Sequence, residues 1–127
     1  MMRLAAVRDL LAAETYSCAD IVESSTIRFG CASDLMSDVL AFSRSGAVLL
    51  TGLVNLQTVQ TAFIAEITAI VFVRGKQPDG EMIRSAQEKR IPLLASPYSM
   101  YEACGILYRN GLSSTMERAA AGAAGRR

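Results

Sequence analysis

Short apolar runs alternate with amphipathic stretches through the middle of the chain. Residues 47–51, 67–73 and 91–95 are mostly apolar and rich in branched side chains, as expected of strands that are buried on both faces of a sheet. The residues between these runs place apolar side chains three and four positions apart, which is the spacing of one helix face. The pattern therefore predicts the order strand, helix, strand, helix, strand.

Local signals mark where helices begin in this region. Asn55 follows the first run and is a candidate N-cap. Pro78, Asp79 and Glu81 are expected to open the second helix, because a proline fits the first turn and carboxylates there face the positive end of the helix dipole. Ser99 and Glu102 have the spacing of a capping box. These signals predict two helices between the strands and a third helix after them.

The first part of the chain carries a weaker pattern. An amphipathic helix is predicted over residues 4–13, whereas residues 16–22 are ambiguous and can form a short strand. A further strand is predicted over residues 26–31. Ser33 is the expected N-cap of the helix that follows it, with Asp34 in the first turn.

Strands separated by single helices indicate βαβ units, whose right-handed crossovers make the strands parallel. We therefore expect a three-layer α/β/α fold with a mainly parallel sheet of about four to five strands. A single domain is expected over residues 1–112. Residues 113–127 are rich in alanine, glycine and arginine and are expected to form a disordered tail.

In a parallel sheet, the turns that follow the strands meet at one edge, where open α/β folds bind ligands. Thr51, Gly52 and Asn55 lie on the first of these turns. Gly52 lets a ligand approach the backbone, and the other two residues offer hydrogen bonds to an anion. The alternative is an ordinary turn in which Asn55 only caps the helix.

Arg74, Gly75, Lys76 and Pro78 lie on the next turn. Two cations beside a helix N-terminus attract a phosphate or a carboxylate, although the same charges also suit a solvated turn. Ser33 and Ser96 lie on the remaining turns of this edge. Each serine is a minor candidate for ligand binding, and local capping is its alternative role.

Other chemistry finds little support in the sequence. The chain has no histidine and three cysteines without metal-binding spacing, so neither a metal site nor a cofactor is predicted. Asp34 and Asp38 share a helix face but provide too few oxygen ligands for a hard cation. Cys31 follows a strand, but no histidine can serve as its base, so a buried or incidental cysteine is the favoured interpretation. We expect no catalytic residues.

Composition limits the classes of partner. The chain is 51% hydrophobic with a net charge of +1, which favours an oligomer interface and gives no basic footprint for nucleic acid. No apolar stretch approaches the roughly 20 residues that cross a bilayer, and Arg8 and Asp9 interrupt any signal-peptide core. A cytoplasmic homodimer is expected.

Gly105 lies inside a predicted helix and permits close packing of that helix against a neighbouring element, either within the subunit or across an interface. Five further side chains on apolar helix faces are expected in the core or at a dimer contact: Met36, Met82, Met100, Tyr101 and Tyr108.

Five segments together resemble a known family. Residues 31–40, 47–52, 71–78, 91–94 and 99–102 are similar to the DRTGG domain, which also resembles the N-terminal domain of bacterial HPr kinase/phosphorylase and occurs beside CBS domains. The resemblance covers most of the chain. It implies a three-layer α/β/α fold, oligomerisation and a regulatory or ligand-sensing role in bacterial metabolism.

Two departures from this family restrict what the resemblance implies. Arg74, Gly75 and Lys76 stand where relatives often have Thr-Gly-Gly, and no phosphate-binding P-loop motif occurs in the chain. Kinase activity is therefore not implied. We predict a non-catalytic regulatory module that binds a small anionic metabolite, with nucleotides as one candidate class. The alternative is a homodimeric scaffold subunit that binds a protein partner and no small ligand.

Overall fold

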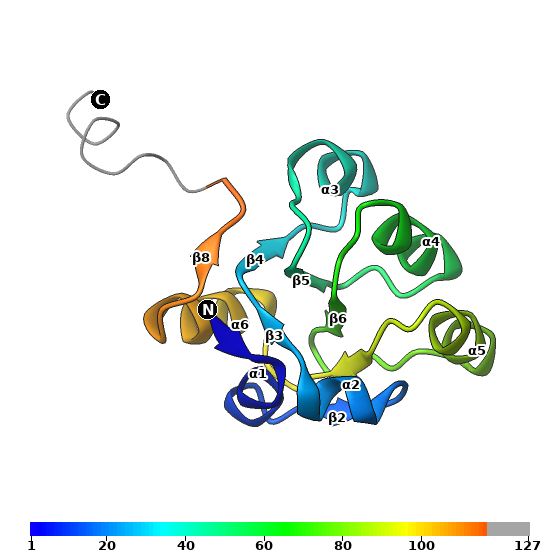
Figure 1. The fold of residues 1–127 in the computed structure, drawn as a ribbon, viewed down its shortest axis with the longest axis horizontal. Helices are drawn as coiled ribbons and strands as arrows, with labels where there is room; N and C mark the ends of the chain where they lie inside the picture. The colour runs from blue at the N-terminus through cyan, green and yellow to red at the C-terminus, as the bar shows by residue number, and fades with distance from the viewer. Residues whose placement is uncertain (117–127) are drawn as a thin grey trace.

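A six-stranded sheet forms the centre of the molecule (Figure 1). The computed structural model describes residues 1–116. The strands lie in the order β2, β7, β6, β5, β4, β8, and every neighbouring pair is parallel except β2 and β7. The strands of this sheet are β2 (Glu14–Thr15), β4 (Phe29–Ala32), β5 (Ala47–Thr51), β6 (Ala69–Phe72), β7 (Leu93–Ala95) and β8 (Ser113–Ser114).

Helices cover both faces of this sheet, which gives the three-layer α/β/α arrangement (Figure 1). One face carries α1 (Leu4–Leu10), α2 (Ala19–Ser24) and α6 (Met100–Arg109), and the other carries α3 (Met36–Phe42), α4 (Leu56–Ile64) and α5 (Gly80–Glu88). The strands β1 (Met2–Arg3) and β3 (Thr26–Ile27) form a separate antiparallel pair.

The central strands are buried on both faces and divide the interior into two cores. Val48 and Leu50 of β5 pack in the core under α1, α2 and α6, whereas Ala47 and Leu49 pack in the core under α3, α4 and α5. All five residues of β5 are buried. This arrangement confirms the predicted fold class, because an apolar run without polar alternation requires a covering layer on each face.

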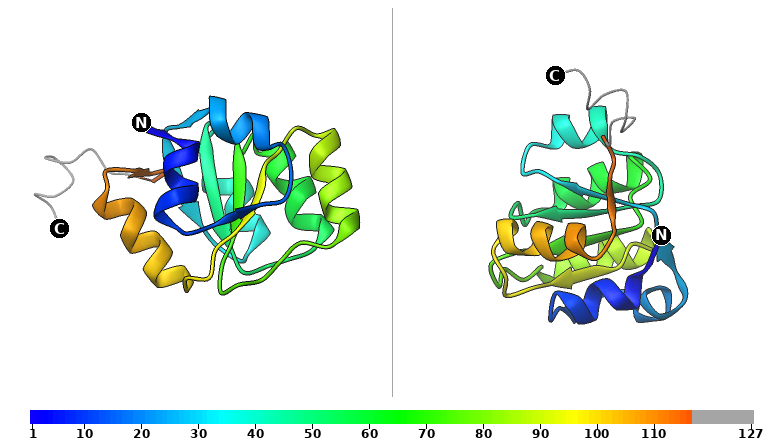
Figure 2. Two further views of the ribbon diagram at one scale, coloured as in Figure 1. Left: turned by 90° about the horizontal axis from the view of Figure 1, so that it is seen from below. Right: turned by 90° about the vertical axis from the view of Figure 1, so that its left-hand side faces the viewer.

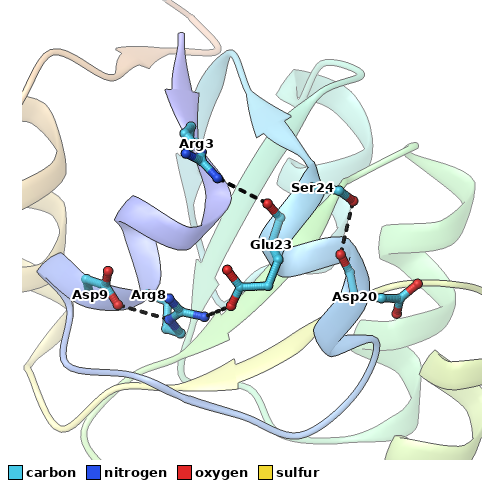
Figure 3. Close-up of polar contacts among 6 residues, drawn as sticks. All are labelled: Arg3, Arg8, Asp9, Asp20, Glu23 and Ser24. Carbon is cyan, nitrogen blue, oxygen red and sulfur yellow. Dashed lines mark hydrogen bonds and ion pairs between the residues drawn. The ribbon is translucent and has the colours of Figure 1, made fainter.

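Polar contacts join the first two helices on the outside of their layer (Figure 3). Arg8 pairs with Glu23 of α2 and with its own neighbour Asp9. Arg3 donates to the backbone carbonyl of Glu23 over 3.2 Å, and Ser24 Oγ donates to the Asp20 carbonyl over 3.0 Å. The Arg8–Glu23 pair joins α1 to α2, and the Arg3–Glu23 bond joins β1 to the same helix.

The structure differs from the predicted elements near the sheet edges. Helix α3 begins at Met36 with Leu35 at its N-cap position, so Ser33 is not the helix cap and Asp34 lies before the helix. Within residues 16–22, the chain enters α2 rather than a strand. Ser113 and Ser114 of the predicted tail form β8, and residues 117–127 lie outside the described part of the chain. None of the described helices is long and apolar enough to span a membrane.

Candidate ligand site at the carboxyl edge of the sheet

Four turns meet where β4, β5, β6 and β7 end. We call this region the carboxyl edge and define it as residues 33–35, 52–55, 74–78 and 96–99. Because these strands are parallel, their C-terminal ends lie side by side even though the turns are far apart in sequence. Every side chain proposed from the sequence as a ligand contact lies on one of these turns or at the strand end beside it.

The turn after β5 already holds a negatively charged group. The Asp34 carboxylate accepts hydrogen bonds from Thr51 Oγ1 over 2.9 Å and from the Gly52 backbone N–H over 2.6 Å. Thr51 is completely buried, and its hydroxyl oxygen also accepts from Leu53 N–H over 3.1 Å. The donors predicted to bind an external anion therefore bind a carboxylate of the chain itself.

Two cations lie beside this turn. The Lys76 ammonium donates to the Gly52 carbonyl over 2.8 Å. A Cβ atom at Gly52 would stand 3.4 Å from the Arg74 guanidinium and 3.4 Å from the Asp34 carboxylate. Both charged groups thus lie within ordinary van der Waals contact of this position on the turn. Arg74 and Lys76 are both exposed, so a ligand from solvent can reach them.

The backbone around Arg74 adopts a conformation that is uncommon for a residue with a side chain. Arg74 and Gly75 have φ angles of 59° and 72°, in the left-handed region that glycine favours. Hydrogen bonds from Arg74 N–H to the Tyr98 carbonyl and from Gly75 N–H to the Ser96 carbonyl hold this turn in place. The turn therefore fixes the start of the Arg74 side chain against the neighbouring strand.

The remaining predicted residues serve the structure of the edge. Asn55 caps α4, because its Oδ1 accepts from Thr58 N–H over 3.0 Å. Ser96 is completely buried and donates to the Leu11 carbonyl over 2.7 Å. Ser33 Oγ accepts from Leu35 N–H over 3.0 Å, and Pro78 is buried just before α5. The structure brings these residues to one edge but uses the polar side-chain atoms of Asn55, Ser96 and Ser33 in hydrogen bonds within the chain.

Asp34 is the residue of this edge that sequence reasoning assigned to a different role. It was expected to face the dipole of α3, but its carboxylate instead reaches the end of the adjacent strand β5. The sequence did place Asp34 after an expected strand and next to Ser33, which was the available signal that it lies at this edge. Its partners were not predictable from spacing because they lie on another turn.

The cysteines of the described residues are not activated nucleophiles. Burial raises the pKa of the Cys31 thiol above its ordinary value, and burial together with the nearby Cys31 raises the pKa of Cys104. Burial also raises the pKa of Cys18. A raised pKa lowers the thiolate fraction at neutral pH. No group of three or more acidic or cysteine side chains that could hold a metal ion occurs within residues 1–116.

No protein-family model matches the chain, and no curated protein matches it. A solved structure with a similar fold contains the CBS and DRTGG domains of the regulatory region of Clostridium perfringens pyrophosphatase, in complex with its activator diadenosine tetraphosphate. The two chains are 14% identical, with a TM-score of 0.66 over 80% of this chain and 44% of the other. The present chain thus matches less than half of that structure, and the similarity establishes a shared α/β fold.

Proposed function

We propose that this protein is a non-catalytic regulatory module that binds a small phosphate-bearing metabolite at the carboxyl edge. One observation carries the proposal. The Asp34 carboxylate rests on the Gly52 N–H and the Thr51 hydroxyl, beside the exposed cations Arg74 and Lys76. The turn is thus chemically suited to an anionic group.

The proposed ligand contacts are the exposed groups of the turn after β6. Arg74 and Lys76 supply the charge that holds the phosphate, and the Gly75 turn gives the ligand access to the backbone. Asp34 competes with the ligand for the same donors and cations. The likeness in fold to a regulatory region that was crystallised with diadenosine tetraphosphate makes nucleotides the first class to test.

The test is thermal unfolding of the full chain with adenine and guanine nucleotides, diadenosine tetraphosphate, coenzyme A, acetyl phosphate and inorganic phosphate. A specific ligand at about one hundred times its Kd adds about 2.7 kcal/mol to the free energy of unfolding. This corresponds to a shift of several degrees in Tm for a domain of this size. We expect the Arg74→Ala/Lys76→Ala variant to lose that shift.

A matched control removes one arginine and one lysine from the opposite edge of the sheet. Arg44 and Lys89 precede β5 and β7, and their cations lie 4.1 Å and 5.8 Å from the ring centroids of Phe29 and Phe63. The Arg44→Ala/Lys89→Ala variant should keep the ligand-induced shift, even where its own Tm is lower. If both double variants lost the ligand-induced shift in Tm equally, the ligand would be binding through the overall positive charge of the protein and not at this site.

An alternative function as a scaffold subunit is favoured by exposed apolar side chains on α3 and α4. These two helices pack side by side, and four large apolar residues on them are about half exposed or more: Leu40, Phe42, Phe63 and Ile64. Such a surface suits a protein partner. If no metabolite shifts Tm, and a polypeptide partner that binds the wild-type chain fails to bind a Phe63→Ser/Ile64→Ser variant, the scaffold function replaces the sensor.

A further inference from the structure

Helix α6 presents a face to solvent that nothing in the described chain covers. It lies on the outside of its layer (Figure 2), with Ala103 and Leu107 turned into the core. Tyr101 and Tyr108 are 89% and 64% exposed, although aromatic side chains were expected in a core or an interface. Gly105 lies between them on the same face of the helix.

Gly105 has no close neighbour among the described residues 1–116 that would require a glycine. A Cβ atom at this position would meet no heavy atom within 4 Å, and the residue lies in a regular helix where alanine is the better helix former. Close packing inside the subunit, one of the two explanations offered from the sequence, is therefore excluded for the described residues. A close approach by another chain is the explanation that remains.

We propose that a second copy of this chain docks on α6, so that the two helices cross antiparallel at Gly105 about a two-fold axis. Such an axis makes each surface patch its own partner. With about 1.5 Å of rise per residue, Glu102 lies about 4.5 Å before Gly105 and Arg109 about 6 Å after it. In the antiparallel pair, Glu102 of one chain therefore stands opposite Arg109 of the other.

The charges and the aromatic rings separate onto the two sides of this crossing. With about 3.6 residues per turn, Glu102 and Arg109 lie on one flank of Gly105, and Tyr101 and Tyr108 lie on the other. A two-fold axis brings like flanks together, which creates two Glu102–Arg109 pairs on one side and tyrosine contacts on the other. The capping box uses Glu102 Oε1, which leaves Oε2 to accept from the partner's arginine. The helix face is thus complementary to itself in charge.

A groove beside α6 can receive the tyrosine side chains of the partner chain. It has a volume of about 720 Å³ and runs between the helix and the ends of β4 and β8. Its wall includes both tyrosines and several small or apolar residues, among them Gly30, Ala32, Leu50 and Leu112. A partner's tyrosines, placed on the same side of the crossing, would cover this groove and exclude water from it.

The test is sedimentation equilibrium of the full chain at micromolar to millimolar concentrations. We expect a reversible dimer, and we expect Gly105→Leu to raise its dissociation constant by about 30-fold or more, as for the loss of a central hot spot. Within one chain the new side chain meets open space, so circular dichroism should show an unchanged fold. Gly80→Leu adds the same side chain to α5, where only the flexible Arg84 is near, and should leave the dimer intact.

Charge exchange tests the orientation of the two helices. Arg109→Glu sets two carboxylates opposite each other at both ends of the crossing and should dissociate the dimer, whereas Glu102→Arg combined with Arg109→Glu should restore it. A chain that is monomeric at every concentration overturns the proposal. So does a dimer that neither Gly105→Leu nor Arg109→Glu weakens. None of these results depends on a ligand at the carboxyl edge.

Discussion

At the scale of single residues, Asp34 gives the carboxyl edge both a hydrogen-bond acceptor and a negative charge. Asp34→Asn keeps an oxygen that can accept from Gly52 N–H and Thr51 Oγ1 but removes the negative charge. We expect it to cost about 0.5–1.5 kcal/mol of unfolding free energy, because hydrogen bonds to a charged acceptor are the stronger ones. It should also tighten phosphate or nucleotide binding. Calorimetric titration of both proteins with the same ligand measures the change.

Asp34→Ala is the companion variant. It leaves the buried Thr51 hydroxyl and the Gly52 N–H without their acceptor, which should cost about 1–3 kcal/mol in urea unfolding. Asp34→Asn therefore separates charge from hydrogen bonding. An unchanged ligand affinity in Asp34→Asn would show that the ligand does not bind next to Asp34.

At the scale of elements, variants of Asn55 at the N-terminus of α4 can distinguish helix capping from ligand binding. Asn55→Ala removes the acceptor for Thr58 N–H and should lower the free energy of unfolding by about 1 kcal/mol. Asn55→Asp keeps the cap and should recover that stability. If the ligand is anionic and binds at this turn, the new carboxylate should weaken its binding. Urea unfolding gives the first quantity, and titration with the same ligand gives the second.

Urea unfolding and ligand titration test the two roles of Asn55 independently. Loss of stability in Asn55→Ala with an unaltered affinity in Asn55→Asp would confine Asn55 to its capping role. Asp79→Asn on α5 is a useful reference, since Asp79 caps its helix in the same manner through Met82 N–H. Because asparagine is also a good N-cap, this change should leave stability almost unaltered.

The central elements were predictable because their signals are local. The runs that became β5, β6 and β7 are buried on both faces, and the caps Asn55 and Ser99 stand where the sequence indicated. Pro78 and Asp79 were expected in the first turn of α5, but the helix begins at Gly80 with Asp79 as its N-cap. The edge strands β2 and β8 were not predictable. Each contains two residues, and such short pairings depend on a neighbouring strand more than on β propensity.

The sequence predicted where the candidate site lies but not the hydrogen bonds that its residues make. Parallel order brings the turns with Thr51, Arg74 and Ser96 to one edge, and the structure places them there. The internal use of the Thr51 and Ser96 hydroxyls was not visible, since their partners Asp34 and Leu11 are distant in sequence. Spacing along a chain indicates which residues share an edge, whereas hydrogen-bond partners are set by tertiary packing.

At the scale of the whole molecule, the fold and the chemistry of its edge are specified by different residues. Part of the CBS and DRTGG region of a pyrophosphatase has a similar fold at 14% identity, so this arrangement of layers does not require closely similar sequences. The exposed residues of the turns are under no packing constraint from either core. Under the proposed function, we therefore expect ligand specificity to depend on exposed side chains such as Arg74 and Lys76, which lie outside both cores.

The stability of the whole molecule should decrease in alkaline solution. Burial raises the thiol pKa values of Cys18, Cys31 and Cys104 above their ordinary value in the folded chain. Above the ordinary thiol pKa, the unfolded chain has therefore released protons that the folded chain still holds. The thiols' stabilising effect is complete below the ordinary thiol pKa of about 8.5 and is lost as pH rises through their folded pKa values. Urea unfolding under reducing conditions at pH 7, 9 and 10 should show this decline, and Cys31→Ala/Cys104→Ala should show a smaller one. Parallel declines in the two proteins would mean that these thiols titrate alike in the folded and unfolded chains, and that other groups cause the loss.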